Sequence, residues 1–347
     1  MTELINLRSD TQTLPTEEML AAINSAPLGD DTYDEDPTVQ KLESMAAKLL
    51  GKEAALLVIS GHMGNLAALM AHAKPGDEVL LDPESHIFYY EAGSMANIAG
   101  LMPMPVRAPG GMMDPAELKA AIRSRNLHYP VPRVLCLENT HNRSGGRVMP
   151  LELHDELCSV AHERGMSVHL DGARIFNAAV KLGIPAADLA AHADSIMFCL
   201  SKGLSCPLGS MIVGSKEFIG RADLCRKRLG GGMRQAGIIA ACGIVALEKM
   251  VDRLADDHKN ARLLAEGLQD VPGLKIDLST VETNMVYVDH TASGLSTGEI
   301  LARWKVAGVL GGGRPPHHVR LVTNRHHDAE IVADAVKRIK DAMEVSG

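Results

Sequence analysis

The sequence predicts an α/β fold in which a mostly parallel central sheet carries helices on both faces. Short apolar runs at residues 54–59, 133–138 and 167–170 are typical of buried strands. Segments with apolar residues at helical spacing lie between these runs. This alternation favours parallel pairing, because each helix carries the chain back to the start of the next strand.

The first 73 residues contain an arm, two helices and the first strand–turn–helix unit. Residues 4–14 show no helical period and form the arm, and Thr16 is a candidate N-cap for a short helix behind Pro15. An acidic loop at 29–36 precedes an amphipathic helix at 37–50, which Gly51 ends. The strand at 54–59 runs into a glycine-containing turn at 60–65, and a helix follows at about 66–73.

The same order repeats further along the chain. Strands are predicted at 78–81, 133–138, 167–170 and 209–213, with helices opening at Ser85 and spanning 150–165. A basic helix carries Arg221, Arg226, Lys227 and Arg228, and one long helix at about 240–269 links two domains. The remainder is predicted as a smaller α+β unit, with strands at 274–278 and 283–288 and another starting at Arg320. A helix opened by the capping box Ser296–Glu299 and a terminal helix at 328–345 complete it.

These elements suggest three segments. Residues 1–30 form an N-terminal arm and helix packing with the small domain, 31–245 form a large cofactor-binding domain, and 246–347 form the small C-terminal domain.

Composition excludes several classes of protein. A net charge of −8 and scattered basic residues argue against nucleic acid as the main partner. No apolar stretch is long enough to cross a bilayer, and the charged N-terminus does not resemble a signal peptide. The six cysteines lie mostly within apolar segments and are expected to be reduced thiols of a cytoplasmic protein.

Lys202 follows the apolar run 196–200 almost directly. A lysine at the end of a buried strand lies at the mouth of the core, where its amine is partly desolvated and suited to forming a Schiff base. A solvated loop lysine is the alternative interpretation. Residues elsewhere in the chain favour the Schiff-base interpretation. Polar side chains follow every predicted strand, and ligands of such sheets bind beyond the carboxyl ends of the strands.

Together these residues supply what pyridoxal phosphate needs from a protein. Lys202 offers the amine, Asp171 an acid for the pyridine nitrogen, and the turn containing Ser60, Gly61 and His62 a cradle for the phosphate. His86, at a helix start, is a candidate to stack on the ring. Arg174 and Arg320 are candidates for a carboxylate, because the guanidinium fork binds two oxygens at once.

Several motifs together resemble the low-specificity L-threonine aldolases, pyridoxal-phosphate enzymes of the aspartate-aminotransferase-like fold type I. They cover nearly the whole chain in the right order: LRSDT at 7–11, SH at 85–86, ENTHNRSGG at 138–146, HLDGARIFN at 169–177, SKGL at 201–204, GGGMRQ at 230–235 and RLVT at 320–323.

The resemblance implies a role for each matching residue. Lys202 would hold the cofactor covalently, Asp171 would pair with its pyridine nitrogen, and His86 and His141 would lie on either side of the substrate hydroxyl. Three further sets are implied: Ser9, Arg174 and Arg320 for the substrate carboxylate, Ser60, Gly61 and His62 for the phosphate, and Tyr33 and Arg234 for a site shared with a neighbouring subunit. The family is therefore expected to act as a dimer or tetramer.

Two positions depart from the family pattern. His62 stands where a threonine is usual, and residues 33–36 read Tyr-Asp-Glu-Asp where Tyr-Gly-Glu-Asp is frequent.

The implied reaction is cleavage of L-threonine, L-allo-threonine or another β-hydroxy-α-amino acid, such as phenylserine, to glycine and an aldehyde. The base that takes the β-hydroxyl proton is His86, His141 or a water that they hold. A β-eliminating lyase using the same cofactor is one alternative. A metal-dependent hydrolase is another, with ligands drawn from His169, Asp171 and the histidine pairs at 317–318 and 326–327.

Overall fold

The computed structural model describes residues 4–344, which form two compact units. The larger unit comprises residues 14–143 and 148–251, and the smaller takes the described chain up to Thr13, residues 144–147 and the chain from Asp252 onward. Helix α1 (Glu17–Ser25) belongs to the larger unit and packs against α11 (Gly237–Lys249), and not with the small domain as expected for residues 1–30.

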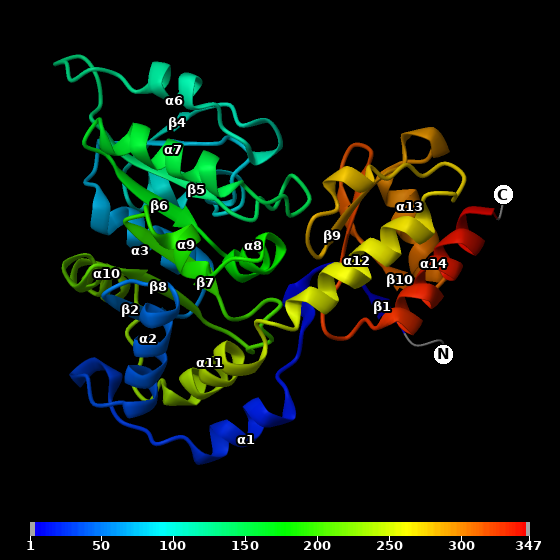
Figure 1. The fold of residues 1–347 in the computed structure, drawn as a ribbon, viewed down its shortest axis with the longest axis horizontal. Coiled ribbons are helices and arrows are strands. Elements are labelled where there is room, and N and C mark those ends of the chain that lie inside the picture. Colours follow the sequence, from blue (N-terminus) through cyan, green and yellow to red (C-terminus); the bar gives the residue numbers. More distant parts are fainter. Residues whose placement is uncertain (1–3, 345–347) are drawn as a thin grey trace. The chain divides into compact units, whose positions relative to one another are not determined.

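A seven-stranded sheet forms the centre of the larger unit (Figure 1). Its spatial order is β2 (Ala54–Val58), β8 (Ser210–Gly214), β7 (Ser195–Cys199), β6 (Ser167–Asp171), β5 (Pro132–Glu138), β3 (Glu78–Leu81) and β4 (Met102–Pro105). Five strands, from β7 to β4, pair in parallel. Strand β8 runs antiparallel to both β7 and β2, so β2 points the same way as the parallel strands. The predicted fold class is confirmed.

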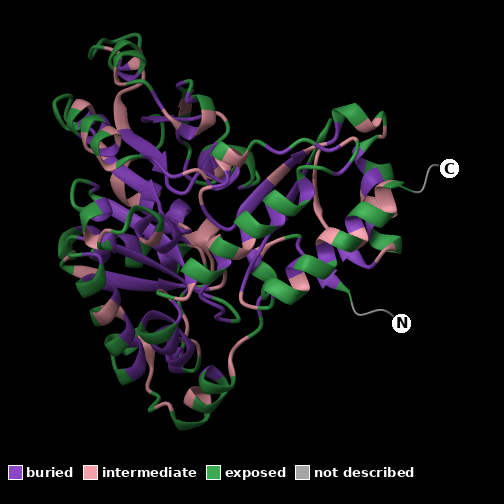
Figure 2. Cartoon of the chain, turned by 45° about the vertical axis from the view of Figure 1, so that its right-hand side comes forward, coloured by how far each residue is buried: buried purple, intermediate pink, exposed green. Residues whose placement is uncertain are grey.

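Helices lie on both sides of this sheet (Figure 1). Besides α1 and α11, they are α2 (Pro37–Leu49), α3 (Gly61–His72), α4 (His86–Tyr89), α5 (Ser94–Asn97), α6 (Pro115–Ala121), α7 (Leu151–His162), α8 (Ile175–Leu182), α9 (Ala186–Ala190) and α10 (Lys216–Arg228), with short 3-10 turns at Asp31–Tyr33 and Pro109–Gly111. Most strands of the sheet are buried (Figure 2). Apolar residues of α3, α5 and α10 join alternate strand residues in the core.

Helix α3 packs unusually close to strand β7 because two glycines face the strand. A Cβ at Gly61 would lie 2.9 Å from Cys199 Sγ, and one at Gly64 would lie 2.7 Å from Met197 Cγ. These glycines therefore serve helix–sheet packing, and they set the position of the helix start relative to the edge of the sheet.

The smaller unit is an α+β structure with its own core. Its antiparallel sheet has the order β11 (Gly312–Arg314), β12 (His318–Val322) and β9 (Met285–Asp289), and a separate parallel pair joins β1 (Ile5–Asn6) to β10 (Val309–Leu310). The helices are α12 (Leu254–Leu268), α13 (Thr297–Val306) and α14 (Ala329–Glu344), with 3-10 turns at Asp10–Gln12, Leu278–Thr280 and Thr291–Ser293. The predicted capping box at Ser296 and Glu299 is present.

Three expected elements differ from the structure. The long helix at 240–269 is two helices, α11 and α12; α12 restarts behind Arg253 with acidic residues in its first turn. The strand at 274–278 is reduced to one bridge, Lys275 to Asp289, because the Asp277 side chain accepts from Ser279 N–H and turns the chain. The turn at 60–65 is the first part of α3, capped by Ser60. Val345, the expected last residue of the terminal helix, lies outside the described residues.

All six cysteines are free and buried. Within residues 4–344, no helix combines the length and apolar character that crossing a bilayer requires.

Candidate active site

The residues singled out at the strand ends of the larger unit share one edge of its sheet. Strands β2, β3, β5, β6 and β7 all point the same way, so their carboxyl ends meet at this edge. Asp171 is the last residue of β6, and Ser60, His86, His141 and Lys202 lie in the segments that follow the other four strands. The predicted convergence of these segments is therefore a property of the fold.

Asp171 is the last residue of β6 and is buried. Its Oδ1 accepts a hydrogen bond from Ala173 N–H at 3.1 Å, and its Oδ2 accepts one from the Asn65 amide at 2.9 Å. These two donors fix the plane of the carboxylate. Each oxygen retains capacity to accept a further hydrogen bond, such as one from a ring N–H.

His86 lies at the start of α4, close to two carboxylates. Its Nδ1 lies 3.0 Å from Glu91 Oε1, and the Asn65 amide also donates to this oxygen at 2.8 Å. Burial alone would lower the pKa of His86, but the hydrogen bond to Glu91 and the charges of Asp171 and Glu91 raise it above its ordinary value, while the Lys202 charge opposes them. His86, Asp171 and Lys202 are thus close enough to influence one another.

Glu138, at the end of β5, connects both histidine segments. Its Oε2 accepts from His86 N–H at 2.6 Å and its Oε1 from Asn142 N–H at 2.8 Å. Burial raises the pKa of Glu138, against the opposing charge of His141. This glutamate therefore ties the backbone at His86 and the backbone beside His141 to the end of β5.

His141 is buried, with Nε2 3.1 Å from Asp82 Oδ2. Burial opposes protonation of this imidazole, but the hydrogen bond to Asp82 and the charge of Glu138 raise its pKa above the ordinary value. Gly111 packs against the ring with φ +81°, and a Cβ there would lie 2.6 Å from His141 Cβ. A glycine is required at this position, because both the backbone conformation and the contact exclude a side chain.

The proposed phosphate cradle is the N-terminus of α3. The Ser60 side chain caps the helix by accepting from Met63 N–H, and His62 Nε2 lies 2.7 Å from Ser94 Oγ. Helix N-termini carry partial positive charge and unpaired N–H groups, which suit an anion. The contact with Ser94 anchors the His62 side chain to α5. Gly61 has no side chain and leaves the backbone of the first turn accessible.

Lys202 lies in the loop that joins β7 to β8, and Arg174 lies between β6 and α8. The Lys202 carbonyl accepts from Ser205 N–H at 2.8 Å, and Cys206 N–H returns to the Leu200 carbonyl at 3.1 Å. Ser205 adopts φ +68°, which gives the loop its sharp reversal. Arg174 is buried at the N-cap position of α8.

The other predicted residues belong to surface segments of the larger unit or to the smaller unit. Tyr33 and Arg234 occupy adjoining surface loops, where Asp31 N–H donates to the Arg234 carbonyl at 3.0 Å; their side chains are 71% and 58% exposed. Ser9 and Arg320 belong to the smaller unit. There Ser9 caps a 3-10 turn and Arg320 donates to the Arg8 carbonyl at 3.1 Å.

Four polar residues of the larger unit were not predicted as part of the site: Asn65, Asp82, Glu91 and Glu138. A glutamate at the end of an apolar strand is a usable signal for Glu138. Asn65 and Glu91 show no such signal, because their partners come from other segments.

Comparison with known proteins identifies the family. Residues 6–291 match the sequence profile of the beta-eliminating lyases. The chain belongs to this family.

Among beta-eliminating lyase relatives, low-specificity L-threonine aldolase 1 of Arabidopsis thaliana is 45% identical over 303 residues, covering 86% of this chain and 85% of the relative. The low specificity L-threonine aldolase of Escherichia coli (strain K12) is 41% identical over 335 residues, covering 95% and 97%.

Solved structures share the fold. The threonine aldolase of Leishmania major superposes with a TM-score of 0.83 at 18% identity, covering 98% of this chain and 99% of that one. Serine palmitoyltransferase of Sphingomonas wittichii superposes with a TM-score of 0.76 at 19% identity, covering 98% and 87%. The predicted resemblance and the predicted fold type are confirmed.

The metal alternative finds little support in the donor set. His169 Nδ1 lies 2.8 Å from Ser195 Oγ and its Nε2 lies 3.1 Å from Asn65 Oδ1, so both ring nitrogens already have partners. The side chains of His86, Glu91 and Asp171 each place one possible ligand atom within 4.8 Å of the others. Asn65 donates a hydrogen bond to Glu91 and another to Asp171, so the negative charge of this three-residue group is already partly compensated within the protein.

Proposed function

We propose that this protein is a pyridoxal-phosphate-dependent aldehyde-lyase that cleaves L-threonine, L-allo-threonine and related β-hydroxy-α-amino acids to glycine and an aldehyde. The observation that carries the proposal is the grouping of Asp171, His86 and Lys202 at the carboxyl edge of the sheet, in a chain 41% identical to the Escherichia coli threonine aldolase.

The residues fit pyridoxal phosphate. Asp171 is a buried carboxylate held by two donors, with capacity left for a pyridine N–H. The first turn of α3 offers N–H groups to a phosphate, and Lys202 extends from a loop at the same edge. A structure of SPT with PLP shares this fold, with a TM-score of 0.76 at 18% identity. When bound, the cofactor supplies an electron sink for the pair released from the Cα–Cβ bond.

The protein's own groups supply orientation and proton transfer. Asp171 would hold the ring nitrogen in its protonated form, and Lys202 would hold the cofactor covalently in the absence of substrate. The resemblance to the threonine aldolases supports the proposal that Arg174, Ser9 and Arg320 bind the substrate carboxylate. The two guanidinium groups would hold the carboxylate in one plane and so align the bond to be broken, and Ser9 would donate its hydroxyl.

Proton removal from the β-hydroxyl is assigned to an imidazole. His86 and His141 both have carboxylate partners, Glu91 and Asp82, which raise their pKa values and strengthen them as bases. The two histidines are joined through Glu138, so the hydroxyl group is expected between them, and a water held by them is the third possible base.

A neighbouring subunit completes the proposal. The exposed Arg234 and Tyr33 are assigned to the site of a second copy, with Arg234 directed at that copy's cofactor phosphate. We therefore expect a dimer with shared sites, assembled further into a tetramer. A cytoplasmic location is part of the proposal, supported by six buried free thiols.

The function is tested by trapping and by product analysis. Borohydride reduction of the yellow holoenzyme is expected to fix the cofactor on Lys202, as seen by peptide mass spectrometry, and Lys202→Ala is expected to lose turnover. L-Threonine should yield glycine and acetaldehyde. Formation of 2-oxobutyrate and ammonia would indicate the β-eliminating alternative, and activity abolished by a chelator would indicate the hydrolase.

A further inference from the structure

A polar seam crosses the otherwise apolar interface between α3 and the sheet. His72 and Asn65 lie two turns apart on α3, about 10 Å along the helix, and so share a face. His169 and Asp171 lie on one face of β6, and Ser195 of β7 pairs in register with His169. All five belong to the larger unit.

These side chains form one continuous series of hydrogen bonds. His72 Nε2 lies 2.7 Å from Ser195 Oγ, which lies 2.8 Å from His169 Nδ1. His169 Nε2 lies 3.1 Å from Asn65 Oδ1, and the Asn65 Nδ2 donates to Asp171 at 2.9 Å and to Glu91 at 2.8 Å. The series connects the end of α3 with the carboxylate assigned to the cofactor.

The carboxylates fix the direction of every donor. The Asn65 NH₂ group donates to Asp171 and to Glu91, so the amide oxygen is the atom that faces His169 and accepts from it. The Nε2 of His169 must then carry the proton. Its Nδ1 accepts from the Ser195 hydroxyl, and the hydroxyl oxygen in turn accepts from the Nε2–H of His72.

Both histidines of the series are neutral at working pH. Burial lowers the pKa of His169 to about 4 and that of His72 to about 3. A neutral imidazole donates from one nitrogen and accepts at the other, which is what a one-directional series requires. The ring of His72 is held by stacking on Phe218, with centroids 4.4 Å apart.

We propose that Asn65 is a positioning residue for Asp171, and that the directional series His72, Ser195 and His169 holds its amide in the productive orientation. This proposal rests on the assignment of Asp171 to the cofactor's pyridine nitrogen. Asn65 and Ala173 each donate to one oxygen of Asp171, so they set the carboxylate plane and leave its remaining lone pairs for the ring N–H.

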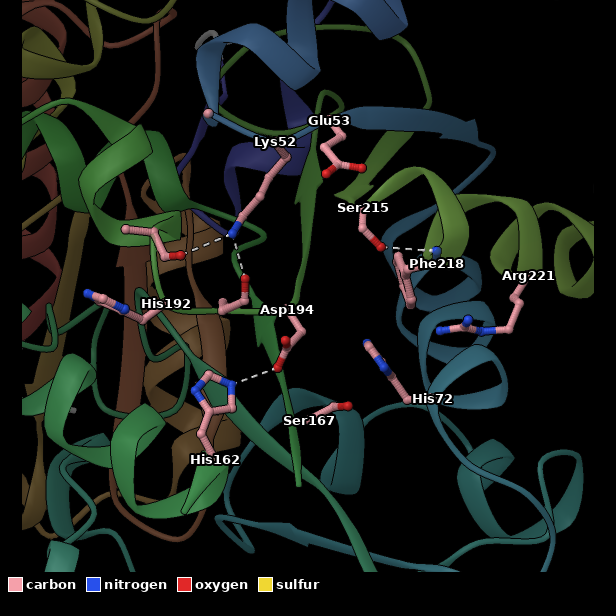
Figure 3. Close-up of a pocket in the computed structure, with 13 residues that line it drawn as sticks. Lys52, Glu53, His72, His162, Ser167, His192, Asp194, Ser215, Phe218 and Arg221 are labelled. Carbon is pink, nitrogen blue, oxygen red and sulfur yellow. Dashed lines mark hydrogen bonds and ion pairs between the residues drawn. The ribbon is translucent and has the colours of Figure 1, made fainter. Parts of the chain in front are cut away.

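The series begins at a polar cleft on the opposite edge of the sheet. This cleft has a volume of about 470 Å³ and is lined by the segments that precede β2, β6 and β7, together with His72 and Phe218. Figure 3 shows His72 beside Ser167 and Asp194 in this cleft, with His192 among the other lining residues. His192 lines the same cleft without being part of the series, which makes it a matched control.

The experiment compares Asn65→Leu, His169→Phe and His169→Gln with His192→Phe. Each apoenzyme is reconstituted with pyridoxal phosphate labelled with ¹⁵N at the ring nitrogen. The ¹⁵N chemical shift reports protonation of that nitrogen, a titration of apoenzyme gives the cofactor Kd, and L-threonine turnover gives kcat and KM.

Wild-type enzyme should show a protonated ring nitrogen. Asn65→Leu should move the ¹⁵N chemical shift towards the value of an unprotonated ring nitrogen, because a hydrogen bond to a charged group is lost. It should also raise the cofactor Kd about tenfold or more and lower kcat by a similar factor, and KM should change less than about threefold. His169→Phe should raise the cofactor Kd and lower kcat by about threefold. His169→Gln should recover part of this loss because it keeps a donor, and His192→Phe should match wild type.

Wild-type ¹⁵N shifts and cofactor affinity in folded Asn65→Leu and His169→Phe would overturn the proposal. If these variants do not fold, ring ¹⁵N spectra of the wild-type histidines decide: the Nε2–H tautomer at His72 and His169 supports the series, and the Nδ1–H tautomer at His169 refutes it. An unprotonated cofactor nitrogen in the wild type would instead overturn the assignment of Asp171, and with it the proposal.

Discussion

Four imidazoles of the larger unit fall into two pairs, whose pKa values shift in opposite directions and whose hydrogen-bond partners differ. His86 and His141 each face a carboxylate, and their pKa values rise despite burial. His72 and His169 face a hydroxyl or an amide, and burial lowers their pKa values to about 3 and about 4. The first pair is suited to proton transfer, and the second to a fixed pattern of hydrogen bonds.

The carboxylate partners allow the base to be identified. A base works in its neutral form, so the acid limb of kcat/KM for L-threonine cleavage is expected above the ordinary histidine pKa of about 6.5. Asp82→Asn removes the partner of His141, and Glu91→Gln removes that of His86. The variant that moves the acid limb to lower pH marks the base.

Glu117→Gln, which changes an exposed carboxylate of α6, serves as the control and should leave the profile unchanged. An unchanged acid limb in both test variants would contradict the assignment of the base to either imidazole.

At this scale the sequence supported the residues whose chemistry is unusual for their position. Lys202, Asp171, His86 and His141 are visible in a linear sequence, because each lies within five residues of the end of an apolar strand and each side chain meets one need of the same cofactor. Asn65 and Asp82 are not, because Asn65 ends the segment that the sequence predicted as a turn, and neither side chain meets a need of the cofactor directly. Their importance arises from partners 106 and 59 positions away, Asp171 and His141.

Among the elements, α3 carries the largest share of the site. Its start faces the proposed phosphate, its middle holds Asn65, and its glycines allow contact with β7. The helix was expected to begin near residue 66, because a glycine-containing segment was interpreted as a turn. The Ser60 cap and the packing against Met197 explain why helical structure extends to Gly61 instead.

Two glycine substitutions test this packing. Gly64→Ala is expected to destabilise the protein by about 1–3 kcal/mol, because the new methyl group meets Met197 Cγ at 2.7 Å. Gly220→Ala, in α10, meets no atom within 4 Å and should stabilise by about 0.5–1 kcal/mol through helix propensity. Urea unfolding measures both, and equal effects of the two changes would contradict the packing argument.

Glu43 of α2 is a second test at this scale. Burial raises the pKa of Glu43 to about 7, while its Oε1 accepts from Leu57 N–H at 2.8 Å. The unfolded chain ionises this group above about pH 4.5, so stability falls as pH rises from there to about 7, and the cost is complete above that pH.

Glu43→Gln keeps the acceptor and removes the ionisation. At pH 8 this substitution should raise the free energy of unfolding by about 1–2 kcal/mol, a figure reduced because Glu43 is partly exposed to solvent. At pH 4 it should change the free energy of unfolding little. A gain of equal size at both pH values would show that ionisation is not the cause.

For the molecule as a whole, the strand–helix alternation, the mostly parallel sheet and the separate C-terminal α+β unit followed from periodicity, whereas the spatial order of the strands did not. The assignment of segments to the two units could not be predicted, because residues 144–147 and the N-terminal arm join the smaller unit through contacts distant in sequence. The break between α11 and α12 was also missed, since apolar spacing continues across it and only the acidic first turn of α12 marks a new start.

Acid stability reflects the neutral histidines. The unfolded chain protonates histidine below about pH 6.5, but His169 stays neutral in the native state down to about pH 4. The contribution of His169 to the free energy of unfolding is therefore complete above pH 6.5 and amounts to about 3 kcal/mol. It is lost as pH falls towards 4.

Urea unfolding at pH 8, 6 and 5 measures this effect. The free energy of unfolding of His169→Gln should fall less steeply with acidification than that of the wild type. Parallel curves for the two proteins would refute the assignment.

The reversal of strand direction at β8 has a consequence for the entropy of cofactor capture. Because β7 and β8 are adjacent and antiparallel, the loop carrying Lys202 starts and ends on neighbouring strands, and Leu200 N–H bonds to the Gly209 carbonyl at 3.0 Å across its base. Its backbone freedom is surrendered when the chain folds. Little backbone entropy would remain to be lost on binding the cofactor, so loop ordering should subtract little from the cofactor affinity.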